Sequence, residues 1–174
     1  MVTKLIALAS VLILTISVYG EKKCKFDYDK EDKITGEKIQ YINYNLFVSA
    51  VKIQIGNNGK QSYFSFGYDM AGDRYEIIKK ETDTLYIRLA NKELIKINPK
   101  ENTKGTSHID AQRKQVYTFY SPIYYMNDDQ LKLLSESPMV AFKFLIEGKE
   151  YTVETSDKKS EKIMEGFECL KSNK

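Results

Sequence analysis

The sequence predicts an α+β fold that is dominated by antiparallel β-sheet. Tyr, Phe, Ile and Val make up most of the apolar side chains, and in the middle of the chain they alternate with polar residues at a period of two, the pattern of half-buried strands. Helical patterns are confined to the last third of the chain and do not alternate with strands as a parallel sheet requires. We therefore expect about eight or nine strands, arranged as a sandwich or a partly open barrel, with two helices.

The clearest hairpin signal covers residues 47–68. One face of its first strand carries mostly apolar side chains: Phe47, Ser49, Val51, Ile53 and Ile55. The sequence GNNG at 56–59 follows as a turn, because Asn and Gly tolerate positive φ. Aromatic residues then alternate with smaller ones up to Tyr68, so a second strand is expected to return beside the first.

Further strands are expected on both sides of a polar loop. Pro99 ends one of them, and Pro122 marks an edge position or a break in another. The polar stretch 100–114 between them predicts a flexible loop. The expected strands are Tyr75–Lys79, which is the weakest, Leu85–Leu89, Leu94–Ile97, Val116–Tyr125, Met139–Ile146 and a short one around Tyr151 and Val153.

Two helices are expected, a short one near 127–136 and a C-terminal one near 157–171. Asn127 with Gln130 three residues later matches a capping box, which satisfies free N–H groups at a helix start. The second helix carries an apolar stripe at helical spacing, formed by Ile163, Met164, Phe167 and Leu170.

Residues 1–20 predict a secretory signal peptide. Lys4 precedes an apolar run that ends at Val18, and compact side chains precede a cleavage site before Glu21. The run is shorter than the roughly 20 residues that span a membrane, so we expect cleavage and no stable membrane anchor. Residues 21–174 would then form a single β-rich domain in the periplasm or outside the cell.

Charge and metal-ligand patterns exclude several classes of partner. The net charge is +3, and the charges are interspersed, so the chain lacks the basic footprint that nucleic-acid binding needs. The acidic segment 27–32 invites comparison with a calcium loop, but Asp32 stands where an EF-hand needs glycine and Lys38 where it needs glutamate. One histidine and two cysteines make a poor set of transition-metal ligands. We expect no metal and no cofactor.

The two cysteines stand at opposite ends of the predicted mature chain. In an oxidising compartment, an even count predicts a disulfide between Cys24 and Cys169. Two free buried thiols are the structural alternative, and a redox pair would need the C-x-x-C spacing that this chain lacks. A disulfide would place the mature N-terminus against the last helix.

No catalytic residue can be assigned from the sequence. Ser107, His108 and Asp110 lie close together in the chain, but neighbours on an extended segment point in different directions and cannot form a nucleophile, base and orienting acid. An exposed loop histidine is the simpler interpretation of His108. A pair of carboxylates could meet in space to hydrolyse a glycosidic bond, although no pair is distinguished by sequence.

Thirteen tyrosines and no tryptophan suggest a recognition surface. Tyrosine brings rigid contact area with a polar tip, and the alternation places several rings opposite the apolar faces. Burial of the second sheet face under another element is the alternative. The candidate binding residues are Tyr63, Tyr86, Tyr117, Tyr120, Tyr124 and Tyr125.

Both ends of the predicted mature chain resemble uncharacterised small exported β-rich proteins of Gram-negative bacteria. The start has a cysteine and an aromatic residue before an acidic stretch and Thr35-Gly36-Glu37, and the end has a cysteine in the helical sequence GFECLK. The resemblance implies export and a disulfide between the ends, and it implies no activity.

These observations favour an exported, non-enzymatic domain that binds a protein or a cell-surface component through a tyrosine-rich sheet face. One alternative is a carrier of a small apolar ligand with a lipocalin-like barrel, although the Gly-x-Trp signature of lipocalins is absent. A second alternative is a hydrolase with an unrecognised site. The sequence does not decide whether the chain is an enzyme, and we expect that it is not.

Overall fold

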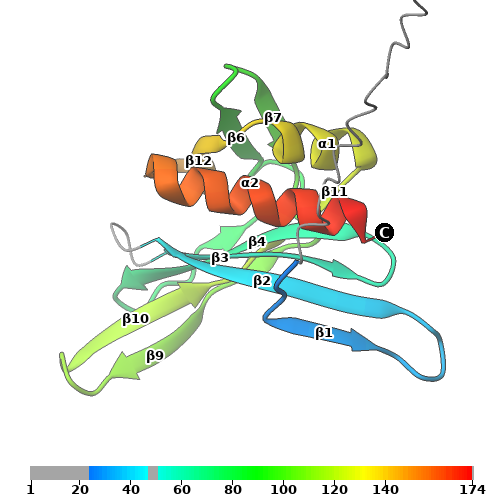
Figure 1. Cartoon of the computed structure of the whole chain (residues 1–174). Coiled ribbons are helices and arrows are strands. Elements are labelled where there is room, and N and C mark those ends of the chain that lie inside the picture. Colours follow the sequence, from blue (N-terminus) through cyan, green and yellow to red (C-terminus); the bar gives the residue numbers. More distant parts are fainter. Residues whose placement is uncertain (1–23, 47–50, 174) are drawn as a thin grey trace, which may run out of the picture.

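The computed structural model describes residues 24–46 and 51–173. The predicted signal peptide, the expected mature start at Glu21, and Phe47 and Ser49 of the predicted hairpin lie outside the described residues. The described chain forms two antiparallel sheets, a two-stranded ribbon and two helices (Figure 1), as the sequence predicts in outline.

The larger sheet has seven strands and curls into a half-barrel. Its strands follow the order β1 (Tyr28–Glu31), β2 (Lys38–Leu46), β3 (Val51–Asn58), β4 (Ser62–Ala71), β10 (Gln115–Tyr120) and β9 (Thr106–Asp110), while β11 (Ile123–Met126) also pairs with β4. β10 and β11 pair with different halves of β4, and Pro122 lies in the break between them. This break confirms the interpretation of Pro122.

The smaller sheet has four strands. They follow the order β13 (Lys149–Glu154), β12 (Met139–Ile146), β6 (Leu85–Leu89) and β7 (Leu94–Ile97). The strands β5 (Ile77–Ile78) and β8 (Thr103–Lys104) pair with each other as a separate two-stranded ribbon. Four rings, from Phe64, Phe66, Phe142 and Phe144, fill the space between the two larger sheets. The centroids of Phe66 and Phe144 are 4.3 Å apart, so the sheets share one core.

The helices α1 (Asp128–Glu136) and α2 (Asp157–Ser172) pack against each other. Asn127 and Gln130 form the predicted capping box, in which each side chain accepts a hydrogen bond from the backbone N–H of the other residue. α2 contacts β2, β3 and β12. Both helices and the four-stranded sheet therefore lie on one side of the seven-stranded sheet (Figure 1).

The predicted disulfide is confirmed. It joins Cys24, just before β1, to Cys169 on α2, with a Cα–Cα distance of 5.6 Å across a sequence separation of 145 residues. The bridge ties the first described residue to the last helix, as expected for a cross-link that closes nearly the whole domain.

Two parts of the sequence interpretation are wrong. The stretch 100–114, expected to be a flexible loop, contains β8 and β9. β9 pairs with β10 along an edge of the sheet, where its side chains stay largely in solvent, so polar residues are compatible with a strand there. The strands β1 and β2 are absent from the sequence prediction. With them and the two short strands of the ribbon, the described residues form thirteen strands, compared with the eight or nine expected.

Candidate functional site

The seven-stranded sheet has one face that no helix of the described chain covers; we call it the open face. On β3, Val51, Ile53 and Ile55 are buried toward α2, while Lys52 and Gln54 lie on the open face. In Figure 1, β1 and the β9–β10 hairpin bend away from α2, so the open face is the concave side of the curled sheet. A concave face without a cover is the geometry in which a ligand can be surrounded.

A row of tyrosines crosses the open face at right angles to the strands. Neighbouring strands place its members directly opposite one another, in the order Tyr28, Tyr41, Gly56, Tyr63 and Tyr125. The rings of Tyr28 and Tyr41 are parallel, with centroids 5.0 Å apart. Tyr63 extends across Gly56, where a Cβ would come within 2.7 Å of the Tyr63 ring. We call the four tyrosines, Tyr28, Tyr41, Tyr63 and Tyr125, the tyrosine row.

Beside the tyrosine row, hydrogen bonds hold two amide side chains in fixed orientations. The Tyr63 hydroxyl donates to Oε1 of Gln54 at 2.9 Å, and Nε2 of Gln54 donates to Oδ1 of Asn43 at 3.0 Å. Nδ2 of Asn43 donates in turn to Asp27 at 3.2 Å. Each amide donates one of its two N–H groups in these hydrogen bonds, and no described residue accepts from the other, which is available to a ligand.

Next to these amides, the open face has a depression of about 160 Å³. Its side-chain walls and floor come from Asn43, Lys52, Gln54, Ser65, Gly67, Phe119 and Ser121. Phe119 is 37 % exposed, and its ring lies over Gly67, where a Cβ would come within 2.8 Å of ring carbons. Lys52 is exposed and has no ion-pair partner among the described residues. The depression thus combines one aromatic wall with several hydrogen-bond donors.

The centre of the open face is more enclosed than an ordinary sheet surface. Tyr63 is 9 % exposed and Ser65 5 %, although no helix lies over them in the described part of the chain. Loss of hydration raises the pKa of Tyr63 to about 12, with smaller contributions from the neighbouring hydroxyls of Tyr41 and Tyr125. The Tyr63 hydroxyl therefore stays protonated, and it keeps donating to Gln54 over the physiological pH range.

The six tyrosines that the sequence singled out separate into three places. Tyr63, Tyr117 and Tyr125 lie on the open face, whereas Tyr86 lies on the four-stranded sheet, where Lys96 and Lys143 hold their ammonium groups over its ring. The expectation of exposure is wrong for Tyr63, which lies on the open face but is only 9 % exposed. It is also wrong for Tyr120 and Tyr124, which are fully buried. Both alternate inward with their strands, and the Tyr120 hydroxyl donates to the carbonyl of Glu76 at 3.1 Å.

The histidine segment does not form a catalytic triad. Ser107 points to the covered side of the sheet, where it bonds to Asp73, while His108 lies on the open face with Nε2 3.7 Å from Asp69. Asp110 accepts hydrogen bonds from the turn that follows it. The alternation of a strand therefore separates these residues, as the sequence predicts, although the segment is a strand rather than a loop.

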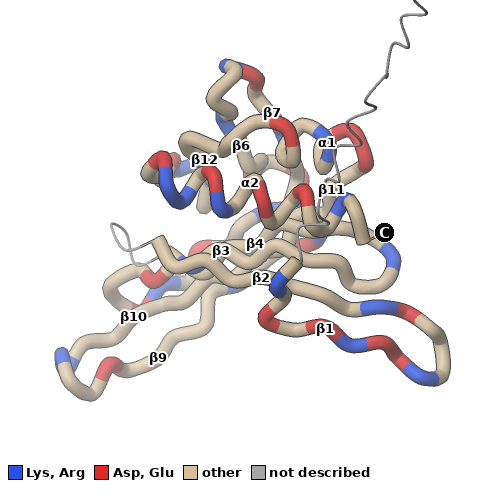
Figure 2. Tube along the Cα trace, viewed as in Figure 1, with Lys and Arg blue, Asp and Glu red and all other residues tan. Residues whose placement is uncertain are grey.

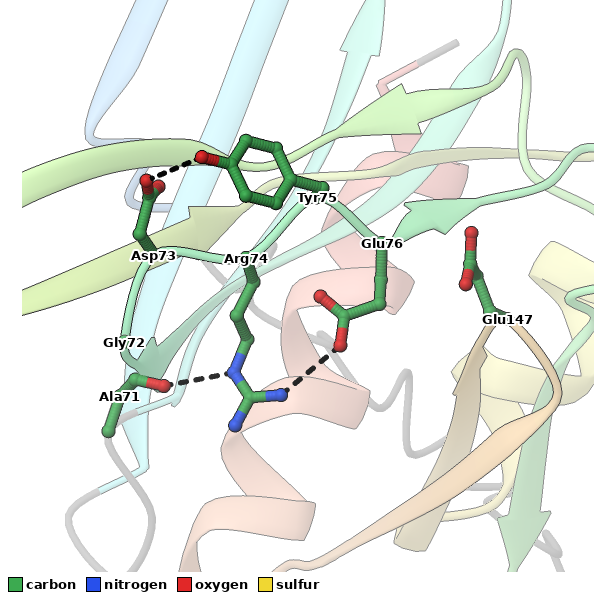
Figure 3. A pocket seen from close by; sticks show the side chains of 7 residues that line it. All are labelled: Ala71, Gly72, Asp73, Arg74, Tyr75, Glu76 and Glu147. Carbon is green, nitrogen blue, oxygen red and sulfur yellow. Dashed lines mark hydrogen bonds and ion pairs between the residues drawn. The ribbon is translucent and has the colours of Figure 1, made fainter.

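A second hollow, of about 500 Å³, lies on the covered side of the sheet around residues 71–76 (Figure 3). Several of its polar groups already have partners within the protein: Nε of Arg74 donates to the carbonyl of Ala71 at 2.9 Å, and Arg74 pairs with Glu76 at 3.3 Å. Asp73 accepts from Ser107 and Tyr75, and these bonds lower the pKa of its carboxyl. These contacts stabilise the loop, so this hollow offers fewer uncommitted polar groups than the open face.

Sequence reasoning missed several residues of the open face. Tyr28 and Tyr41 lie on strands that were not expected, and Asn43, Gln54 and Phe119 carry no motif of their own. The signal that could have found them is register. Once β2, β3 and β4 are paired, these side chains fall on one face with the tyrosines.

Two other kinds of feature are absent from the described residues, a metal-ligand group and a membrane-spanning helix. Residues 24–46 and 51–173 contain no group of three or more His, Cys, Asp or Glu side chains arranged to hold a metal ion. Neither described helix is long and apolar enough to cross a membrane. Comparison of the chain with protein-family models, curated proteins and solved structures finds no match.

Proposed function

We propose that the protein is an exported, non-catalytic binding domain that holds its ligand on the open face of the seven-stranded sheet. One observation carries the proposal: the tyrosine row and two oriented amides line a concave face that no described helix covers. Tyrosine with Asn, Ser and Gly is the composition of surfaces that recognise partners, because rigid rings give contact area and small polar groups adapt to the ligand.

Two features support export: the sequence of residues 1–20 and the disulfide between Cys24 and Cys169. The sequence of residues 1–20 has the features of a signal peptide, and disulfides persist mainly in oxidising compartments outside the cytoplasm. The bond between Cys24 and Cys169 fits such a compartment. A periplasmic or secreted domain meets its ligand in the cell envelope or beyond it.

The chemistry of the open face favours binding over catalysis. The depression offers amide N–H groups, the ammonium group of Lys52 and the ring of Phe119. Such groups orient a ligand, whereas acyl transfer needs a nucleophile in hydrogen-bond contact with a base. The hydroxyl of Ser65, which lines the depression, donates its hydrogen bond to the carbonyl of Pro122 at 2.8 Å.

The alternative of an apolar carrier receives less support. A lipocalin-like carrier encloses its ligand in a closed barrel. Here the edge strands β1 and β9 do not pair with each other, and the concave face carries amides and charged residues. A polar, open trough suits a ligand that itself forms hydrogen bonds.

Co-sedimentation tests the proposed function without knowledge of the ligand. The purified protein is mixed with the insoluble cell-envelope fraction of its source cells, and the bound fraction is measured after centrifugation. We expect the wild-type protein to pellet and the double variant Asn43→Ala/Phe119→Ala to remain mostly in the supernatant. Circular dichroism verifies that the variant is folded.

Two control variants alter other surfaces. Lys158→Ala/Glu161→Ala removes exposed charges from α2, and Tyr86→Ala removes an aromatic ring from the four-stranded sheet. Both controls should pellet as the wild-type protein does. Equal pelleting of the open-face variant and the wild-type protein would contradict the proposal.

A further inference from the structure

We infer that the depression beside Phe119 binds one sugar ring of a glycan. The inference rests on the proposed function, because it names the class of ligand that the open face holds. It follows from the size of the depression, the kind of polar groups that line it, and the single aromatic wall.

The size of the depression matches one six-membered ring. Its volume is about 160 Å³, and a cavity of roughly 150 Å³ in another protein holds benzene. Ser65 contributes only a small side chain to its lining, and the ring of Phe119 occupies the space over Gly67. Phe119 bounds it on one side, and its partly exposed ring gives an apolar surface for the C–H groups of a sugar.

Several hydrogen-bond donors line this space. Gln54 and Asn43 each have one N–H that no described residue uses, and the ammonium group of Lys52 has no partner among the described residues. A sugar ring carries oxygen acceptors around its edge and C–H groups on its faces. It can therefore accept from these donors while one of its faces lies on Phe119.

An apolar or aromatic side chain of a protein partner fits the same space less well. Such a side chain would cover the amide N–H groups of Asn43 and Gln54 without accepting from them, and a donor left unpaired on burial costs binding free energy. Hydroxyl and ring oxygens avoid this loss. The donors thus favour a sugar over an apolar anchor.

The charge around the depression is compatible with a neutral or a weakly acidic glycan. Lys52 contributes a positive charge, and Asp27 and Asp69 on the same side of the sheet contribute negative charges. Figure 2 shows that charged residues are sparse along the central strands β2 and β3. A polyanion would find no continuous basic surface here.

Nuclear magnetic resonance titration tests the inference directly. The purified, isotope-labelled protein is titrated with soluble oligosaccharides of glucose, mannose, N-acetylglucosamine and galacturonic acid. At least one series should shift the side-chain amide signals of Asn43 and Gln54 and the backbone amide of Phe119, with a dissociation constant of about 1 mM for a single ring. Lys52→Met should weaken binding of that series, because it removes one of the hydrogen-bond donors, and the loss should be larger if the sugar carries a carboxylate.

Variants at Phe119 identify the aromatic wall. Phe119→Ala should weaken binding at least about tenfold, which corresponds to the loss of one ring contact. Phe119→Tyr keeps a ring and should retain affinity. Tyr86→Ala, on the other sheet, should bind as the wild-type protein does.

Several results would overturn the inference. One is that no series gives saturable shifts at tens of millimolar, and another is that the shifts centre on the hollow around residues 71–76. If the protein pellets with envelopes but protease treatment of the envelopes abolishes this, the open face binds a protein and only the sugar assignment fails. If the wild-type protein does not pellet and no sugar binds, the proposed function fails as well.

Discussion

The ring of Phe119 lies over Gly67, close enough that a Cβ at position 67 would come within 2.8 Å of two ring carbons. The two residues are not directly opposite in the ladder, since Phe119 faces Asp69. The ring therefore leans along β4 to cover the glycine. This contact fixes an exposed aromatic ring at the edge of the depression, where it can meet a ligand without first losing conformational freedom.

Gly67→Ala should destabilise the fold and displace Phe119. The cost should be about 1 kcal/mol, the lower end of the range for overpacking, because the Cβ would meet the outer end of a partly exposed side chain; the free energy of unfolding measured in urea reports it. In the Phe119→Ala background the added methyl group has room, so Gly67→Ala should cost much less there. Equal costs in the two backgrounds would show that the ring does not cover Gly67.

The stability of the protein should fall at high pH partly because of Tyr63. Burial raises the pKa of this residue to about 12, from an ordinary value of about 10. Between these values the unfolded chain loses the Tyr63 proton while the folded chain keeps it, so the free energy of unfolding decreases as pH rises. Below pH 10 the contribution is fully present. Tyr63→Phe should therefore show a shallower loss of stability between pH 10 and 12 in urea unfolding, and an unchanged slope would contradict the assignment.

Reduction of the disulfide should destabilise the domain strongly. The bond closes a loop with a sequence separation of 145 residues, for which chain entropy gives about 5 kcal/mol as an upper value. Urea unfolding with and without a reductant measures the difference. The Cys24→Ser/Cys169→Ser variant should match the reduced protein and should not respond to the reductant. Equal stability of the oxidised and reduced forms would mean that the bridge does not constrain the unfolded chain.

Asp83→Ala should cost about 3 kcal/mol of unfolding free energy. Asp83 is 1 % exposed, and its Oδ2 accepts from the backbone N–H groups of Lys79 at 2.8 Å and Glu147 at 3.1 Å. The substitution leaves both donors without this acceptor and disconnects two turns. Glu81→Ala, at an exposed position in the same turn, should change stability by less than about 0.5 kcal/mol. Similar effects of the two substitutions would indicate that the Asp83 contacts contribute little.

The sequence predicts those elements whose signals are local. The alternation of Leu85–Leu89 and Leu94–Ile97 and the capping box at Asn127 each depend on residues a few positions apart, and all three are confirmed. β9 could not be found in this way, because an edge strand in solvent has no apolar face to repeat.

The candidate surface depends still more on register. Tyr28 and Tyr41 lie opposite each other, and Tyr41 and Tyr63 are separated only by Gly56, although these three tyrosines lie on three different strands, β1, β2 and β4. Composition could indicate a tyrosine surface, but it could not tell Tyr125 on the open face from Tyr124 in the core. A shift of one residue in pairing reverses the two faces.

Hydroxyl-radical footprinting tests most directly whether the open face is the binding surface. The oxidation rate of each aromatic side chain is compared between the free protein and the protein bound to cell envelopes. The account predicts slower oxidation in the bound state for rings of the open face, namely Tyr28, Tyr41, Phe119 and Tyr125. Tyr75 and Tyr86, on other surfaces, should keep their rates. Protection of Tyr75 and Tyr86 with unchanged rates on the open face would contradict the account.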